Sequence, residues 1–249
     1  MKPLASSLSL SIVIPAYNEE RRLPPTLDAI RAYLDRCPRY SETEILIVDD
    51  GSSDGTIKVV QDMSGKDCRI KLLRNPGNFG KGYSVRHGML EGSGDWILFS
   101  DADLSSPIEE LDKLLDAAQA SGAQIAIGSR ALDRSLIGVH QSPFREAAGV
   151  ALNRIMRFVT GLKFADTQCG FKLFRRDAAR MIFKRQQLEN FSFDVEDLFI
   201  ARMLGIPAVE VPVRWNHVEG TKVGFMAGPQ FLMDLFRIRY KYLLRKYRR

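Results

Sequence analysis

Short apolar segments recur along the chain and alternate with segments whose apolar residues follow helical spacing. The strand candidates are Ser11–Pro15, Glu44–Val48, Arg69–Arg74, Trp96–Ser100, Gln124–Gly128 and Ala208–Val213. Helices are expected between the first five of these, near residues 20–36, 54–66, 80–93 and 107–120. Such alternation is typical of parallel strands joined by right-handed crossovers. The pattern therefore predicts an α/β fold with a mostly parallel central sheet and helices on both faces.

The helix that follows the fourth strand has a clear start signal. Ser106, Pro107 and Glu109 form a capping-box sequence with proline at the first helical position. We therefore expect this helix to begin at Pro107 and Ser106 to have a structural function. The apolar residues at helical spacing are Ile108, Leu111, Leu115 and Ala118.

The second half of the chain is less regular, but it contains no proline-rich or glycine/serine-rich linker and no internal repeat. We expect one main domain over residues 1–225, followed by a basic amphipathic helix over residues 226–249. That helix could belong to the same domain or contact a membrane surface. With 249 residues and 45% hydrophobic content, the chain is long enough to bury one large core.

The cysteine content and the hydrophobic segments indicate the cellular compartment. The three cysteines, Cys37, Cys68 and Cys169, form no C-x-x-C pair, which favours a reducing, cytoplasmic environment over a disulfide framework. No apolar run approaches the roughly 18 residues of a membrane span. The N-terminus resembles a signal peptide only briefly, because Pro15 interrupts the apolar stretch and residues 18–22 are strongly polar.

The net charge of +6 is concentrated at the C-terminus. Seven basic residues and no acidic ones lie between Arg237 and Arg249, which leaves the rest of the chain near neutral. A nucleic-acid-binding domain more often carries its basic residues across the fold, so this distribution disfavours that class.

Polar, glycine-rich and acidic residues follow each of the first four strand candidates, in the sequences PAYNEE, VDDGSSDGT, RNPGNFGKG and SDADL. Ligands of open α/β sheets bind beyond the carboxyl ends of the strands, so these loops are expected to form the site. At the second strand end, we interpret Asp54 as a turn residue. Asp50 follows four apolar residues, and we expect it to bind a ligand.

The sequence SDADL places two carboxylates one residue apart at the end of an apolar strand. On an extended backbone, the side chains of Asp101 and Asp103 would point the same way. Two like charges aimed at one point need a cation between them, and a divalent metal is the obvious candidate.

The glycine-rich loop from Gly77 to Gly82 opens a helix and contains Lys81. Helix N-terminal amides and a lysine suit an anion, although the spacing matches neither a dinucleotide fingerprint nor a P-loop. A metal-binding acidic pair beside such a loop indicates a nucleoside diphosphate whose charge is neutralised by a divalent cation.

These motifs together resemble a known family. SIVIPAYNEE, VDDGSSDGT, NFGKG and DAD, in this order and spacing, are similar to glycosyltransferase family 2 enzymes of the GT-A fold. The later sequences IGSR, DTQCGFKLF, FSFDVEDL and WNHVEGTK resemble the dolichyl-phosphate glucosyltransferase subgroup. The resemblance implies transfer of glucose from UDP-glucose to a polyprenyl phosphate, assisted by Mg²⁺ or Mn²⁺. Relatives of the eukaryotic type carry an N-terminal membrane anchor, and we expect none here.

The resemblance also implies functions for individual residues. Pro15, Tyr17, Glu19 and Asp50 would hold the uracil and ribose, and Lys81 would contact the nucleotide. Asp101 and Asp103 would organise the metal on the diphosphate, with Asp103 the more direct ligand. Gln168 and Asp194 would lie near the transferred sugar. Arg130 and Arg145 would clamp the acceptor phosphate, and His217 with Lys222 would close over the diphosphate.

A lipid acceptor requires access to a membrane. Phe231, Leu235, Ile238 and Tyr242 lie at helical spacing, and Arg237, Lys241 and Arg245 lie on another face. This pattern predicts a helix in the headgroup plane and a protein bound peripherally to the cytoplasmic face of a membrane. The alternative is a terminal helix packed on the core or on a second copy, with solvated charges.

Other functions stay open at this point. A related transferase could use GDP-mannose or UDP-N-acetylglucosamine, or a non-lipid acceptor. Processive synthases carry Q-x-x-R-W, and here Val211 stands where the glutamine before Arg214 and Trp215 should be. A phospho-receiver domain is disfavoured for two reasons. Its acidic pair follows the first strand, whereas here the pair follows the second, and a receiver is only about half as long as this chain. A nucleotidyltransferase would need a glycine-rich loop after the first strand, and PAYNEERR has no glycine.

Overall fold

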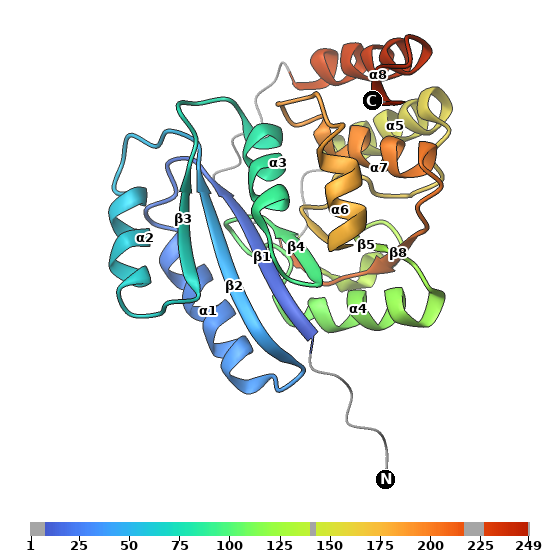
Figure 1. Cartoon of the computed structure of the whole chain (residues 1–249). Helices are drawn as coiled ribbons and strands as arrows, with labels where there is room; N and C mark the ends of the chain where they lie inside the picture. The colour runs from blue at the N-terminus through green and yellow to red at the C-terminus, as the bar shows by residue number, and fades with distance from the viewer. Residues whose placement is uncertain (1–7, 140–142, 217–226, 249) are drawn as a thin grey trace.

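A computed structural model describes residues 8–139, 143–216 and 227–248. Its centre is a seven-stranded sheet in the order β3-β2-β1-β4-β7-β5-β8 (Figure 1). The strands are β1 (Leu8–Ala16), β2 (Tyr40–Asp49), β3 (Ile70–Arg74), β4 (Trp96–Ser100), β5 (Ile125–Ser129), β7 (Phe171–Arg175) and β8 (Ala208–Pro212). All neighbouring pairs are parallel except the two that involve β7. Two short strands, β6 (Ile137–Val139) and β9 (Trp215–Asn216), pair separately. The α/β architecture predicted from the strand pattern is confirmed.

Helices cover both faces of the sheet (Figure 1). One face packs against α1 (Leu23–Arg36), α2 (Thr56–Ser64) and α4 (Glu110–Ser121). The other packs against α3 (Lys81–Glu91), α5 (Pro143–Thr160), α6 (Arg176–Phe183), α7 (Phe193–Met203) and α8 (Ala227–Leu243). Successive residues of a strand face opposite cores, as Ile97 and Leu98 of β4 do. Strands buried on both sides read as continuous apolar runs, which is why the pattern located them.

The antiparallel strand β7 was missing from the predicted elements. It occupies part of the sequence DTQCGFKLF and inserts between β4 and β5, with Phe99 opposite Lys172. Five residues that include a lysine give a weak strand signal, and a return strand cannot be recognised from βα alternation. Its position matters for function, because its first residues lie at the carboxyl end of β4.

The predicted start of α4 is wrong. The helix begins at Glu110 and follows a turn over Pro107–Glu110, and its N-cap residue Glu109 makes no side-chain capping bond. The Ser106 hydroxyl lies instead 4.0 Å from the Sγ of Cys169. Glu110, the first residue of the helix, forms a local ion pair with Lys113 and a long-range one with Arg214.

The C-terminal helix is present, but the face expected to enter a membrane is not exposed. Phe231, Leu235 and Ile238 are buried in the same core as α6 and α7, and Tyr242 packs at its margin. For this face the alternative interpretation, packing on the core, is the correct one. Within the part of the chain that the structure describes, no helix is both long enough and apolar enough to span a bilayer.

Candidate active site

The carboxylates of SDADL do not lie on an extended strand as expected. Strand β4 ends at Ser100, and the chain turns at Ala102 and Asp103 before Leu104 adopts a left-handed φ of 45°. The Asp103 carboxylate stabilises this turn by accepting hydrogen bonds from the backbone N–H and the hydroxyl of Ser105, at 3.0 and 2.9 Å. The local hydrogen bonds of a short acidic side chain therefore outweigh strand continuation.

Lys81 is the point on which the site carboxylates converge. Its Nζ lies 2.7 Å from an oxygen of Asp101, and the amine is also close to the rings of Phe99 and Phe191. Burial acts to lower the pKa of Lys81, but the charges of Asp101, Asp194 and Asp103 outweigh it and raise the pKa. Three carboxylates thus act on one ammonium group at the carboxyl end of β4.

A second lysine, Lys172, lies beneath this cluster and was not identified from the sequence. It comes from β7 and forms an ion pair with Asp194 at the start of α7, and both side chains are buried. Burial raises the pKa of the Asp194 carboxyl above its usual range, although the charges of Lys172 and Lys81 oppose the rise. The signal that could have identified Lys172 was a lysine inside the apolar run GFKLF, since an unpaired charge is not tolerated there.

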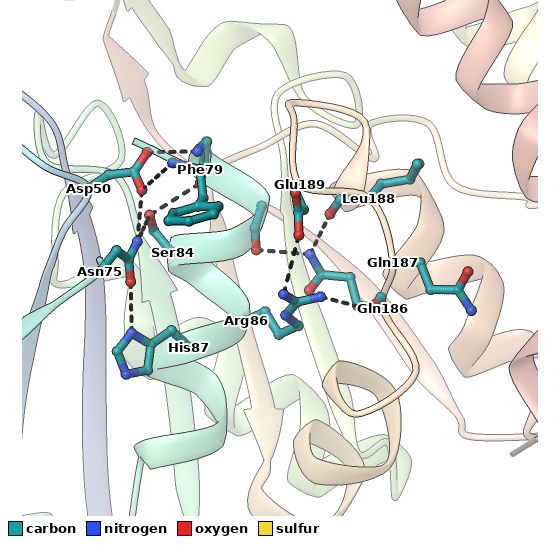
Figure 2. A network of polar contacts seen from close by, with 12 residues as sticks. Asp50, Asn75, Phe79, Ser84, Arg86, His87, Gln186, Gln187, Leu188 and Glu189 are labelled. Atoms are coloured by element: carbon teal, nitrogen blue, oxygen red, sulfur yellow. Dashed lines mark hydrogen bonds and ion pairs between the residues drawn. The ribbon is translucent and has the colours of Figure 1, made fainter. Parts of the chain in front are cut away.

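Asp50 holds the glycine-rich loop in place (Figure 2). One oxygen accepts from the N–H of Phe79 at 3.0 Å and from the amide of Asn75 at 2.8 Å, and the other accepts from the N–H of Gly80 at 2.8 Å. The same Asn75 amide donates to Ser84 at 2.9 Å. The described contacts of Asp50 therefore shape the loop, and its predicted contact with a nucleotide remains a prediction.

The loop after β1 contains the other residues expected to contact uracil and ribose. Pro15 lies in β1 opposite Val48, and the side chain of Tyr17 is exposed beyond the strand end. Glu19 is buried and forms an ion pair with Arg22 at 2.6 Å, so this carboxylate also fixes the first turn of α1.

Arg130, at the end of β5, is oriented by a buried aspartate. Its Nε and a terminal nitrogen donate to the two oxygens of Asp166, at 2.6 and 2.9 Å, and its guanidinium lies 5.4 Å from the ring centroid of Trp215. Burial alone would raise the pKa of Asp166, but the charge of Arg130 outweighs this and lowers it. Gln168 is exposed, and its backbone N–H donates to the same carboxylate.

Some predicted residues are not placed. Arg145 belongs to α5, but its side chain is outside the description, and His217 and Lys222 lie outside the described residues. The structure brings together Asp101, Asp103, Asp194 and Lys81, and the functions expected of these residues remain predictions.

The loop before α7 connects this cluster to the C-terminal helix. The carbonyl of Glu189 accepts from the N–H of Gly82 at 2.8 Å, beside the lysine loop. Asp234 of α8, fully buried, accepts from the amide of Asn190 at 2.8 Å and from the hydroxyl of Ser192 at 2.9 Å. Sequence reasoning missed Asp234, whose only signal was an acidic residue on the apolar face of the helix.

The donor set suits a hard divalent cation that the protein alone does not enclose. Carboxylate oxygens are the ligands that Mg²⁺ and Mn²⁺ prefer, and Asp101 and Asp103 both act on Lys81. Among the described residues no three His, Cys, Asp or Glu side chains group closely enough to form a metal site by themselves. Two carboxylates therefore fit a site whose other ligands come from a phosphorylated substrate and water.

Comparisons with known proteins agree with this geometry. The family model described as "Glycosyl transferase family 2" matches residues 11–183, more than half of the chain. Dolichyl-phosphate beta-glucosyltransferase of Drosophila melanogaster is 38% identical over 255 residues, covering 97% of this chain and 78% of that protein. The protein of the same name from Mus musculus is 39% identical over 246 residues, covering 94% and 76%.

Solved structures support the GT-A fold. Mannosyl-3-phosphoglycerate synthase from Rubrobacter xylanophilus superimposes with a TM-score of 0.70 at 17% identity, over 97% of this chain and 76% of that one. Glucosyl-3-phosphoglycerate synthase from Mycobacterium tuberculosis, in complex with Mn²⁺, UDP-glucose and phosphoglyceric acid, gives a TM-score of 0.65 at 20% identity, over 93% and 79%.

The buried acid next to the site yields a pH prediction. Asp197 of α7 is 2% exposed, and its Oδ1 has no hydrogen-bond partner among the described residues. Burial, followed by the charges of Glu196 and Asp194, raises the pKa of Asp197 well above its usual range. Above about pH 4 the unfolded chain loses a proton that the folded chain keeps, so this group lowers stability by about 1.4 kcal/mol per pH unit as the pH rises.

We therefore expect Asp197→Asn to remove that dependence. In urea unfolding above about pH 4, the difference in unfolding free energy between the variant and the wild type should increase with pH in favour of the variant, by at most about 1.4 kcal/mol per pH unit. The exposed substitution Asp28→Asn is the control. A variant whose difference from the wild type does not change with pH would mean that Asp197 is ionised in the fold.

Proposed function

Because the chain belongs to glycosyl transferase family 2, we propose that it transfers glucose from UDP-glucose to a polyprenyl phosphate of the dolichyl type, with release of UDP. The observation that carries the proposal is its 38% and 39% identity, over nearly its whole length, to enzymes named dolichyl-phosphate beta-glucosyltransferase. The pair Asp101 and Asp103 offers carboxylate ligands for a divalent cation, and Lys81 beside them offers an ammonium group for phosphate, which supports a sugar nucleotide as the donor.

In this proposal the donor binds at the carboxyl ends of β1 to β4. Asp101 and Asp103 would hold Mg²⁺ or Mn²⁺, which would offset the negative charge that develops on the leaving diphosphate. Lys81 lies beside Asp101 and reaches the nucleotide phosphates. Pro15, Tyr17, Glu19 and Asp50 form the wall for uracil and ribose.

The acceptor needs no general base. A phosphate monoester has a second pKa of about 6, so it is largely dianionic at neutral pH and already a nucleophile. One of its oxygens forms a bond to the anomeric carbon while the bond from that carbon to the UDP oxygen breaks, which inverts the configuration. The cations proposed to position the acceptor phosphate are Arg130 and Arg145, with His217 and Lys222 over the diphosphate.

Asp194 and Gln168 are proposed to position the transferred sugar. Asp194 is buried and tied to Lys172, which suits a carboxylate that accepts a hydrogen bond from a sugar hydroxyl. We propose that the enzyme works at the cytoplasmic face of a membrane as a peripheral protein, because its acceptor is a lipid.

A transfer assay tests this function directly. Purified protein is given UDP-glucose, GDP-mannose or UDP-N-acetylglucosamine, with a short-chain polyprenyl phosphate or 3-phosphoglycerate as acceptor. We expect glucose to be transferred to the polyprenyl phosphate, and this activity to be lost with EDTA, restored by Mn²⁺ and absent in Asp103→Ala. Removal of a group that stabilises leaving charge should cost about 10²-fold or more.

Lys66→Ala, an exposed change away from the site, is the matched control and should keep full activity. Transfer of another sugar, or transfer to 3-phosphoglycerate alone, would contradict the proposed donor or acceptor while leaving the family assignment intact.

The pH dependence of Asp194→Asn tests whether this residue is a base. The amide keeps a hydrogen-bond acceptor for the sugar but cannot take a proton, so kcat/KM should fall by less than the roughly 10²–10⁴-fold typical of a lost general base. The shape of the pH–rate profile should be that of the wild type. Loss of one ionisation from the profile would identify Asp194 as a base and refute this assignment.

A further inference from the structure

The C-terminal helix α8 carries a second apolar face, opposite the buried one. Its members are Met233, Phe236, Tyr240 and Leu243, which are 54%, 64%, 64% and 70% exposed. They follow one another at intervals of three and four residues, so they form one stripe along the helix. The next residue, Leu244, is also exposed. One side of α8 is therefore packed on the core, and the other has no partner among the residues that the structure describes.

The neighbouring helix α5 also carries exposed apolar side chains. The two helices lie side by side (Figure 1). On α5, Phe158 is 90% exposed and Ile155 is 41% exposed. We call the set Ile155, Phe158, Met233, Phe236, Tyr240, Leu243 and Leu244 the α5–α8 surface. Exposed apolar residues gathered in this way mark an interaction site, whereas scattered ones need no explanation.

The surroundings of the α5–α8 surface are positively charged. Among the described side chains, the exposed basic residues on the two helices and just after α8 are Arg154, Arg157, Arg237, Arg239, Arg245 and Lys246. Among the described side chains of α8 the acid is Asp234, which is fully buried and engaged by Asn190, Ser192 and Arg237. The partner of this surface must therefore be apolar at its centre and anionic at its edge.

An open groove adjoins the surface. It has a volume of about 650 Å³ and runs between α8 and the loops around Phe79 and Leu188. Arg237, Lys241 and Lys246 line it, and its acidic wall residue Glu189 is paired with Arg86 at 3.5 Å. A groove with three cations beside an apolar stripe can accept an anionic headgroup while the attached chains stay on the stripe.

We propose that the α5–α8 surface docks on an anionic phospholipid bilayer, with its apolar side chains at the acyl boundary and its basic side chains among the headgroups. The groove then receives a headgroup phosphate. Basic amphipathic helices bind membranes through this combination of apolar area and charge. The choice of a bilayer rests on the proposed function, because a polyprenyl phosphate lies in a membrane.

Self-association is the competing use of an apolar face, and the charges oppose it. In a two-fold symmetric dimer the same patch faces itself, so the basic residues of one copy would meet those of the other. The described side chains of α8 provide no exposed acid to compensate. An anionic lipid surface satisfies both the apolar stripe and its basic edge.

Vesicle binding of the full chain tests the proposal without requiring catalysis. Binding is measured by flotation with phosphatidylcholine vesicles and with vesicles that also contain phosphatidylglycerol. We expect the wild type to bind the anionic vesicles only. Phe236→Ser combined with Leu243→Ser should weaken binding about tenfold or more, and Arg157→Gln or Arg239→Gln about fivefold each.

Two control variants make this result specific. Met181→Ser removes an exposed apolar side chain on α6, and Lys66→Gln removes an exposed charge, and neither should alter binding. All variants should keep the wild-type transfer rate with a water-soluble short-chain acceptor, which shows that they are folded. If the wild type transfers glucose but does not bind anionic vesicles, the docking proposal alone is overturned. The docking proposal is also overturned if the wild type is a dimer that the Phe236→Ser and Leu243→Ser changes dissociate.

Vesicle binding by a protein that transfers no sugar would instead overturn the proposed function and leave the docking surface intact. Equal binding by the wild type and by the Phe236→Ser, Leu243→Ser variant would overturn the assignment of the surface.

Discussion

The arrangement of the site depends on how the fold neutralises carboxylates at the carboxyl end of β4. Asp101 and Asp194 come from distant parts of the chain, and each is paired with a lysine, Lys81 or Lys172. Both amines lie within 6 Å of the Phe99 ring, at 5.4 and 5.6 Å from its centroid. Asp194 is the buried one of the two carboxylates, and an ionised carboxylate at such a position needs a partner, because an unpaired buried charge costs several kcal/mol (about 3–5 when one partner of a pair is removed). The antiparallel insertion of β7 is what brings the second lysine to this position.

The C-terminal helix α8 also stabilises the loops around the site. Through Asp234 it holds the loop of Asn190 and Ser192, and that loop contacts the backbone of Gly82 next to Lys81. At the chain end Tyr247 is fully buried, and its hydroxyl donates to Glu196 of α7 at 2.6 Å. The helix proposed to meet the membrane thus also supports the loop beside Lys81, where the proposed function places the nucleotide.

The sequence alone predicts two kinds of feature: the strands, which recur as apolar runs, and the polar loops at the strand ends. Apolar runs located six of the strands, and the polar sequences after β1 to β4 located the edge of the sheet where Asp101, Asp103 and Lys81 meet. The turn at Asp103 could not be predicted from the alternation of side chains along a strand. It is stabilised by a hydrogen bond from the backbone N–H of Ser105 to the Asp103 carboxylate. The structure also shows Asp50 and Glu19 holding their own loops, a function that ligand-based reasoning did not anticipate.

Long-range contacts account for what the sequence could not predict. Lys172 is recognised as a site residue only through its ion pair with Asp194, 22 positions later in the sequence. The insertion of β7 into the sheet brings the two residues together. Helix α8 has apolar residues on two sides, at Leu235 and Ile238 and at Phe236 and Leu243, and packing against the core decides which side is buried. Periodicity reports both sides equally, so the sequence alone predicts membrane contact for a side that the structure buries.

We propose that Asp101 and Asp103 form a cation site that the nucleotide completes, with Lys81 paired to Asp101 beforehand. Electron paramagnetic resonance distinguishes bound from free Mn²⁺ and can be recorded with and without UDP. We expect weak Mn²⁺ binding by the protein alone, strong binding once UDP is added, and loss of that gain in Asp103→Ala. We also expect Lys81→Met, which frees Asp101, to strengthen Mn²⁺ binding without UDP. Equal binding with and without UDP, or an Asp103→Ala variant that binds like the wild type, would contradict it.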